Sequence, residues 1–296
     1  MSRDRHHHMK RQYKYAAGAA VVILLALITL VSVHISPKPQ NTSSSSRPLY
    51  VALGDSVAAG VGLKPDSDSS ACNRTDQAYS HVVSGSSYRL ISLACSGATI
   101  TDGISGPQTV NQLELPGQLN QLYKLSQPNM ISLTSGANDV GWTEFLSRCY
   151  TERCGTATDQ AILADRLNIL SANFDQVLRD LGDHYSTPPA VYITGYYQVF
   201  PTAVPNNCVD LTGIDSDELA FGRSVQDQIS TTIRAVASRY SFVHFVPLNF
   251  SDHELCTADP WVQGLTASQP YHPTAAGQKS IAEAILSQMK SKKVTT

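Results

Sequence analysis

The sequence predicts an α/β fold in which helices cover both faces of a five-stranded parallel sheet, preceded by one transmembrane helix. Two patterns lead to this prediction. Short β-rich runs alternate with longer segments of helical periodicity, and an uncharged apolar stretch lies near the amino terminus. Strands buried on both faces by helices are typical of parallel sheets. The chain has 296 residues and is 42% hydrophobic, which is enough for a large packed core.

The amino-terminal segment is predicted to anchor the chain in a membrane. Residues 1–15 form a basic tail, and residues 16–35 include an apolar run long enough to cross a bilayer as a helix. The positive-inside rule places the tail in the cytoplasm and the rest of the chain outside the cell. We expect an uncleaved anchor because no Ala-x-Ala site follows the run, with a cleaved secretory signal as the alternative. Residues 36–48 read as a flexible linker to a domain at 49–296.

Within this domain, five runs are predicted as strands because they are short, apolar and rich in β-branched or aromatic residues. They are residues 49–53, 88–93, 130–134, 190–194 and 242–246. Apolar residues spaced three and four apart predict helices between the strands. These helices are at residues 118–125, 159–181 and 217–240, with a last one at 274–289.

The cysteines favour disulfides over metal ligation. The six cysteines lie in a domain predicted to be exported, and they show no Cys-x-x-Cys spacing. The sequence alone does not choose among the possible pairings. Cys149 and Cys154 are close enough to close a small loop, and the other four flank strand-like segments. We therefore expect the pairs Cys72–Cys95, Cys149–Cys154 and Cys208–Cys256, and no metal site.

The charge balance argues against a nucleic-acid partner. Lys and Arg together number 22, against 24 for Asp and Glu. Proteins that bind nucleic acids carry a concentrated excess of basic residues, and this composition gives no sign of one.

A serine and a histidine follow predicted strands in positions suited to nucleophilic catalysis. Ser56, in Gly54-Asp55-Ser56, comes directly after the strand at 49–53, and His272 follows the last strand and precedes Pro273. The carboxyl ends of parallel strands meet at one edge of a sheet, where α/β proteins place their sites. A serine hydroxyl needs a base to become a good nucleophile, and a neutral imidazole can supply it. We expect Ser56 to be the nucleophile and His272 the base.

Negative charge on a tetrahedral intermediate requires preorganised hydrogen-bond donors. The candidates are the main-chain N–H groups of Ser56 and Gly97 and the side-chain amide of Asn138, each just after a strand-like segment. The alternative role for Asn138 is to form the turn in Gly136-Ala137-Asn138-Asp139. Asp55 and Asp139 are expected to hydrogen-bond the loops rather than react.

Together these blocks resemble the SGNH hydrolases, also called GDSL esterases and lipases. The matching blocks are Gly54-Asp55-Ser56, Gly97, Gly136-x-Asn138-Asp139 and His272-Pro273, in the family's order. The local sequences around Tyr196 and around His253 to Cys256 are similar to a secreted actinobacterial branch with three disulfides. The resemblance implies a flavodoxin-like three-layer α/β/α sandwich and ester hydrolysis without metal or cofactor. It also implies Ser56 as nucleophile, His272 as base, and Ser56, Gly97 and Asn138 as the oxyanion hole.

One position departs from the family pattern. Members commonly carry an Asp three residues before the histidine, and this chain has Gln269 there. In some relatives a main-chain carbonyl takes that role, so the resemblance suggests that the Gln269 carbonyl orients the imidazole of His272. A Ser-His dyad would then act without a carboxylate. The Gln269 side-chain oxygen, Asp252 and Asp259 are the alternative partners.

The leading interpretation is a monomeric extracytoplasmic serine esterase or lipase that is tethered to the membrane by its amino-terminal helix. Its substrate would be an ester of an acyl lipid or of an acetylated glycan. A cell-envelope O-acyltransferase and a catalytically silent glycan- or lipid-binding module are the alternatives. Residues 64–77 and 141–158 are expected to border the cleft, and their sequences show no pattern for an acyl-chain groove.

Overall fold

A computed structural model describes residues 47–64, 71–205 and 207–293 of the chain. The predicted basic tail (1–15), the predicted membrane span (16–35) and most of the linker lie outside these residues. Within the described part of the chain, no helix has both the length and the apolar character that a bilayer crossing needs.

The main sheet has five parallel strands in the order β2-β1-β5-β6-β7. Their bounds are β1 Leu49–Gly54, β2 Arg89–Ser92, β5 Met130–Thr134, β6 Ala190–Thr194 and β7 Val243–Val246. Strands β1 and β5 are buried along their whole length, because they are central and their apolar side chains pack on both faces. Gly54 pairs with Thr134, so β1 and β5 end side by side. The predicted five-stranded parallel sheet is confirmed.

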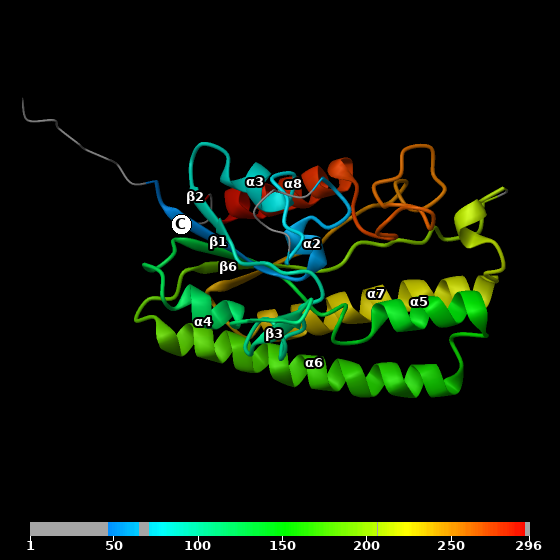
Figure 1. Cartoon of the computed structure of the whole chain (residues 1–296), viewed down its shortest axis with the longest axis horizontal. Helices are drawn as coiled ribbons and strands as arrows, with labels where there is room; N and C mark the ends of the chain where they lie inside the picture. The colour runs from blue at the N-terminus through cyan, green and yellow to red at the C-terminus, as the bar shows by residue number, and fades with distance from the viewer. Residues whose placement is uncertain (1–46, 65–70, 206, 294–296) are drawn as a thin grey trace, which may run out of the picture. The chain divides into compact units, whose positions relative to one another are not determined.

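Helices cover both faces of this sheet, as Figure 1 shows. Helices α3 (Tyr79–Ser84) and α8 (Ala275–Lys293) pack together on one side, and α6 (Ala157–His184) and α7 (Ser216–Ala237) pack together on the other. The buried face of α6 carries the apolar stripe expected from the sequence, with Leu163, Leu167, Leu170, Phe174, Val177 and Leu181. The three-layer α/β/α arrangement follows from these two apolar helix faces.

Helices α6 and α7 begin before their predicted starts at 159 and 217, and each has a capping box. In α6, Thr156 Oγ1 accepts from the N–H of Asp159 at 3.2 Å, and the Asp159 carboxylate accepts from the N–H of Thr156 at 3.0 Å. Asp215 and Glu218 form the same reciprocal pair at the start of α7. These caps satisfy N–H groups that the first helical turn leaves without partners.

Several short elements were not predicted from the sequence. They are α2 (Ser56–Ala59), α3, α5 (Trp142–Thr151), the 3₁₀ helix η1 (Val209–Leu211), and a hairpin of β3 (Gln108–Val110) and β4 (Leu113–Leu115). The predicted helix at 118–125 is present as α4 (Gln118–Leu122), which ends early because the chain turns after Leu122 toward β5.

Three disulfides connect the loops: Cys72–Cys95, Cys149–Cys154 and Cys208–Cys256. These are the three pairs expected from the sequence, and no described cysteine is free. Cys149 belongs to α5 and Cys154 to the segment before α6, so their disulfide fixes the end of α5. Cys208 precedes η1 and is joined to the loop that follows β7.

Candidate active site

Ser56 lies at the carboxyl end of β1, as the first residue of the four-residue helix α2. The chain turns sharply before it, because Gly54 has a φ of +138°, a conformation that L side chains rarely adopt. Asp55 then caps α2, and its Oδ1 accepts from the N–H of Val57 at 2.9 Å. Gly60 ends the helix with a φ of +81°. This short strand-turn-helix unit fixes the position of the Ser56 hydroxyl.

The imidazole of His272 is in hydrogen-bonding contact with this hydroxyl. Its Nε2 lies 2.8 Å from Ser56 Oγ, although 216 residues separate the two in the sequence. His272 belongs to the loop before α8. The contact has the length expected of a serine O–H donating to a neutral imidazole nitrogen.

The other ring nitrogen of His272 is held by a main-chain carbonyl. Its Nδ1 lies 3.1 Å from the carbonyl oxygen of Pro270, so Nδ1 carries the hydrogen and Nε2 is free to accept. The Gln269 carbonyl, which the sequence predicted for this role, also acts on the ring, more weakly than the Pro270 carbonyl. Tyr271, between Pro270 and His272, has a φ of +67°, and this left-handed turn brings the Pro270 carbonyl back toward the ring.

Neither aspartate proposed as an alternative partner is hydrogen-bonded to the imidazole of His272 among the described residues. Asp259 contacts a different histidine: its main-chain carbonyl lies 2.7 Å, and its carboxylate 3.5 Å, from His253 Nδ1. Among the residues that the structure describes, no carboxylate is hydrogen-bonded to the His272 ring. Burial lowers the pKa of His272, and the Pro270 and Gln269 carbonyls oppose this more weakly. Both nearby carbonyls therefore favour the imidazolium without adding a full negative charge.

The three expected oxyanion donors differ in how they are engaged. Within the described residues, no hydrogen bond uses the N–H of Ser56 or of Gly97. Asn138 Nδ2 donates to the Ala98 carbonyl at 2.9 Å, which leaves its second amide hydrogen available. Ser56, Asn138 and His272 line one cavity of about 60 Å³. Gly97 does not line it, but the Asn138–Ala98 bond holds the Gly97 loop against the Asn138 loop.

Asp139 makes the second bond between these two loops. Its Oδ1 accepts from the N–H of Ile100 at 2.9 Å, while its Oδ2 is buried with no partner among the described residues. Burial raises the pKa of Asp139 to about 6, and the Ile100 hydrogen bond only partly opposes this. Asn138 and Asp139 thus position the loop that carries Gly97, the role that the sequence analysis assigned to Asp139.

Two residues that the sequence analysis did not assign to the site hold its loops together. Tyr196, just past β6, donates its hydroxyl to the Asp55 carboxylate and accepts from the N–H of Ala137 at 3.1 Å. It therefore links the Ser56 loop to the Asn138 loop. Gln118 binds both main-chain groups of Gly54, accepting from its N–H at 2.8 Å and donating to its carbonyl at 2.9 Å. Burial raises the pKa of Asp55 to about 7 despite its hydrogen bond from Tyr196.

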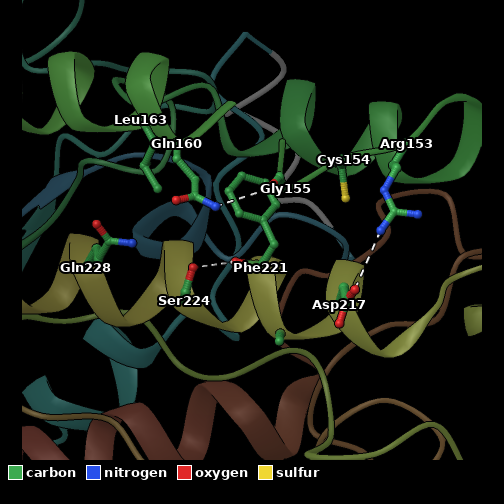
Figure 2. Close-up of a pocket in the computed structure, with 10 residues that line it drawn as sticks. Arg153, Cys154, Gly155, Gln160, Leu163, Asp217, Phe221, Ser224 and Gln228 are labelled. Atoms are coloured by element: carbon green, nitrogen blue, oxygen red, sulfur yellow. Dashed lines mark hydrogen bonds and ion pairs between the residues drawn. The ribbon is translucent and has the colours of Figure 1, made fainter. Parts of the chain in front are cut away.

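A larger cavity lies away from this chemistry. It has a volume of about 580 Å³, lies between the start of α6 and α7, and is lined by none of the expected catalytic or oxyanion residues. Figure 2 shows Arg153 reaching across it to Asp217, with 3.5 Å between the charged groups. The walls of this cavity between α6 and α7 are polar, and its charged groups are paired with each other. The small cavity at Ser56 is therefore the better candidate for catalysis.

A profile of the GDSL-like lipase/acylhydrolase family matches residues 52–279, which is most of the chain and includes every expected site residue. The protein belongs to this family. It is a carboxylic ester hydrolase of the GDSL type, and the resemblance inferred from the sequence is confirmed.

Relatives of this GDSL hydrolase include Lipase 1 of Streptomyces coelicolor, which is 30% identical over 240 residues covering 77% of this chain and 82% of the relative. The crystal structure of an extracellular lipase from Streptomyces rimosus matches with a TM-score of 0.65 and 29% identity, covering 81% of this chain and 99% of that one. A phospholipase A1 from Streptomyces albidoflavus NA297 matches with a TM-score of 0.61 and 25% identity, covering 82% of this chain and 99% of that one.

Replacing Asp139 with Asn should weaken the pH dependence of this hydrolase's stability. The carboxyl pKa is raised from 3.8 to about 6, so its contribution to folding is complete below pH 4 and is lost as the pH rises toward 6. Asn keeps an acceptor for Ile100 and does not ionise. As the pH rises from 4 to 7, the free energy of unfolding of the wild type should therefore fall relative to that of the Asp139→Asn variant, by up to about 2 kcal/mol.

Urea unfolding of both proteins across this pH range measures the difference. Asp55 titrates in both proteins, and the charge of Asp139 is only a minor cause of its raised pKa, so most of its contribution cancels in the comparison. Parallel stability curves for the two proteins would show that the pKa of Asp139 is not raised in the folded protein.

Proposed function

We propose that this GDSL hydrolase is an extracytoplasmic serine esterase in which Ser56 is the nucleophile and His272 the general base. The observation that carries the proposal is the 2.8 Å contact between His272 Nε2 and Ser56 Oγ. Burial keeps the imidazole neutral by lowering its pKa, which is the state a base requires. Hydrolysis is proposed rather than acyl transfer because the matching family is described by lipases and acylhydrolases and the relatives are named lipases.

The reaction would proceed in two steps. In the first, Ser56 Oγ attacks the ester carbonyl carbon as its proton moves to His272 Nε2, and the carbonyl oxygen becomes an oxyanion. The N–H groups of Ser56 and Gly97 and the amide of Asn138 would stabilise that charge. The intermediate collapses as the imidazolium gives its proton to the leaving alkoxide, which departs as an alcohol. In the second step, water deprotonated by His272 attacks the acyl-serine, releasing the acid and restoring Ser56.

The Pro270 carbonyl supports both steps by holding His272 in the tautomer that has its hydrogen on Nδ1. A carbonyl dipole stabilises the imidazolium less than a carboxylate would. The site is therefore proposed to act as a Ser-His dyad that is positioned by the main chain.

The Ser56→Ala variant tests the assignment directly. It removes the nucleophile and should lower kcat/KM for p-nitrophenyl esters by at least about a thousandfold, with His272→Ala losing a similar amount. Ser86→Ala, at an exposed serine between α3 and β2, is the matched control and should keep full activity. Full turnover by a folded Ser56→Ala protein would reject the proposed nucleophile.

We also propose that the domain works outside the cytoplasm, tethered by residues 16–35. Three disulfides favour an oxidising compartment, and the Streptomyces rimosus relative is named an extracellular lipase. The full chain should sediment with membranes and its domain should be cut by protease added to intact cells, whereas a chain starting at residue 47 should stay in the supernatant. Recovery of the domain in the medium without residues 1–35 would support the cleaved signal instead.

A further inference from the structure

A buried glutamine on the hairpin of β3 and β4 reaches the Gly97 loop. Gln108 is the first residue of β3, and its side chain is 9% exposed. Its Nε2 donates to the main-chain carbonyl of Ser96 at 2.7 Å. The hairpin is therefore joined to the peptide unit that carries the N–H of Gly97.

The carbonyl of Ser96 and the N–H of Gly97 are the two ends of one peptide unit. A peptide unit is planar, and in the trans form its C=O and N–H point in opposite directions. None of the described peptide bonds is cis. Gln108 thus holds this unit from the end opposite the N–H, which has no hydrogen-bond partner within the described residues. The bond fixes the direction in which the free N–H points.

The same bond makes the Gly97 N–H a stronger donor. A carbonyl that accepts a hydrogen bond draws electron density from the N–H of its own peptide unit, and such chained bonds strengthen one another by roughly 10–30% per bond. An oxyanion donor is most effective when its direction and its partial charge are set before the reaction begins. Gln108 can therefore influence the oxyanion without contacting the substrate.

The other main-chain donor has the same kind of support from a different source. The N–H of Ser56 shares its peptide unit with the Asp55 carbonyl, which accepts from the N–H of Ala59 at 3.0 Å as α2 begins. Gly97 lies in a turn and not at the start of a helix, so the main chain supplies no such partner there. The Gln108 side chain takes that place.

The rest of the Gly97 loop is fixed independently of Gln108. The Cys72–Cys95 disulfide closes the loop on one side, and the N–H of Ser96 donates to the Cys72 carbonyl at 3.1 Å. Both remain when Gln108 is replaced. We therefore expect a change at Gln108 to alter the orientation and polarity of one peptide unit while the loop keeps its fold.

We propose that Gln108 is a positioning residue of the oxyanion hole, which orients and polarises the Gly97 N–H through the Ser96 carbonyl. The inference rests on the proposed ester hydrolysis at Ser56. Because the oxyanion forms only along the reaction, the contribution of Gln108 should appear equally in kcat and in kcat/KM. The hairpin of β3 and β4 then has a role, which is to carry Gln108 to the loop.

The test removes the amide and keeps the size of the side chain. Gln108→Met should lower kcat and kcat/KM for p-nitrophenyl acetate alike, by about tenfold, which is less than the roughly hundredfold or greater loss expected for a whole oxyanion donor. Titrating Ser56 with a fluorophosphonate gives kcat per active site and so excludes unfolded protein. The matched control is Gln121→Met, in the wall of the same cavity of about 290 Å³. Gln121 donates to the Pro116 carbonyl at 2.8 Å, and its variant should keep full activity.

Two further readouts separate this role from a general loosening of the fold. A boronic acid that forms a tetrahedral adduct on Ser56 should bind Gln108→Met more weakly, with a Kd raised by the same factor as kcat/KM falls. The acid limb of the pH profile should not move, because no described hydrogen bond joins Gln108 to His272. Gln108→Glu, assayed at pH 8, presents an acceptor to the Ser96 carbonyl and should lose at least as much activity. It is the second variant if Gln108→Met does not fold.

The outcomes separate this inference from the proposed function. Unchanged kcat in Gln108→Met, an equal loss in Gln121→Met, or a boronic acid affinity that does not follow kcat/KM would overturn the role of Gln108. Full activity of Gln108→Glu at pH 8 would do the same. Each of these results leaves the Ser56 and His272 assignments in place. Full turnover by Ser56→Ala would instead reject the proposed function, whatever the Gln108 variants show.

Discussion

The site depends on the close approach of β1 to β5 at Gly54. A Cβ atom at this position would lie 2.2 Å from the Thr134 carbonyl oxygen, so only glycine fits there. The next residue uses the same carbonyl, because the N–H of Asp55 donates to Thr134 at 2.9 Å. Gln118 holds both main-chain groups of Gly54 from the side. The chain is thus forced to leave the sheet at one point and in one direction, which places Ser56 at the edge where His272 arrives.

The loops that meet at this edge are joined by hydrogen bonds of buried and partly buried polar side chains. Tyr196 joins the Ser56 and Asn138 loops, and the Asn138–Asp139 pair joins the second of these to the Gly97 loop. This arrangement buries two carboxyl groups whose raised pKa values show that their ionised forms are poorly solvated. Buried polar bonds specify geometry more sharply than apolar contacts, and oxyanion stabilisation requires donors in fixed positions. Some stability at neutral pH is given up for that geometry.

Much of this structure could be predicted from the sequence, and the remainder has physical reasons. Strands β5 and β6 match their predicted bounds because they are short, mostly buried runs rich in apolar and β-branched residues. The hairpin of β3 and β4 was missed because its turn residues, Asn111 and Gln112, have positive φ without the Asn-Gly signal of such turns. The short helix α5 was missed although Phe145, Leu146 and Cys149 form a buried face at helical spacing, because the segment is only ten residues long.

The candidate site was predicted in its reactive groups and missed in its supports. Ser56, Gly97, Asn138 and His272 stand in recognisable blocks after strands. Gln118 and Tyr196 act through single side-chain bonds across the fold, and no local pattern marks a glutamine or a tyrosine for that role. The placement of both the Pro270 and the Gln269 carbonyls at the His272 ring depends on the backbone angle at Tyr271, which the sequence does not specify.

The central claim is that a neutral His272, oriented by a main-chain carbonyl and not by a carboxylate, accepts the hydrogen bond of Ser56. A ¹⁵N NMR titration of the histidine side chains, assigned by comparison with a His272→Gln variant, tests it most directly. The account predicts that His272 is neutral at pH 7 with its hydrogen on Nδ1, and that it titrates below its ordinary pKa of 6.5. A hydrogen on Nε2 at pH 7, or a pKa above 6.5, would contradict the account.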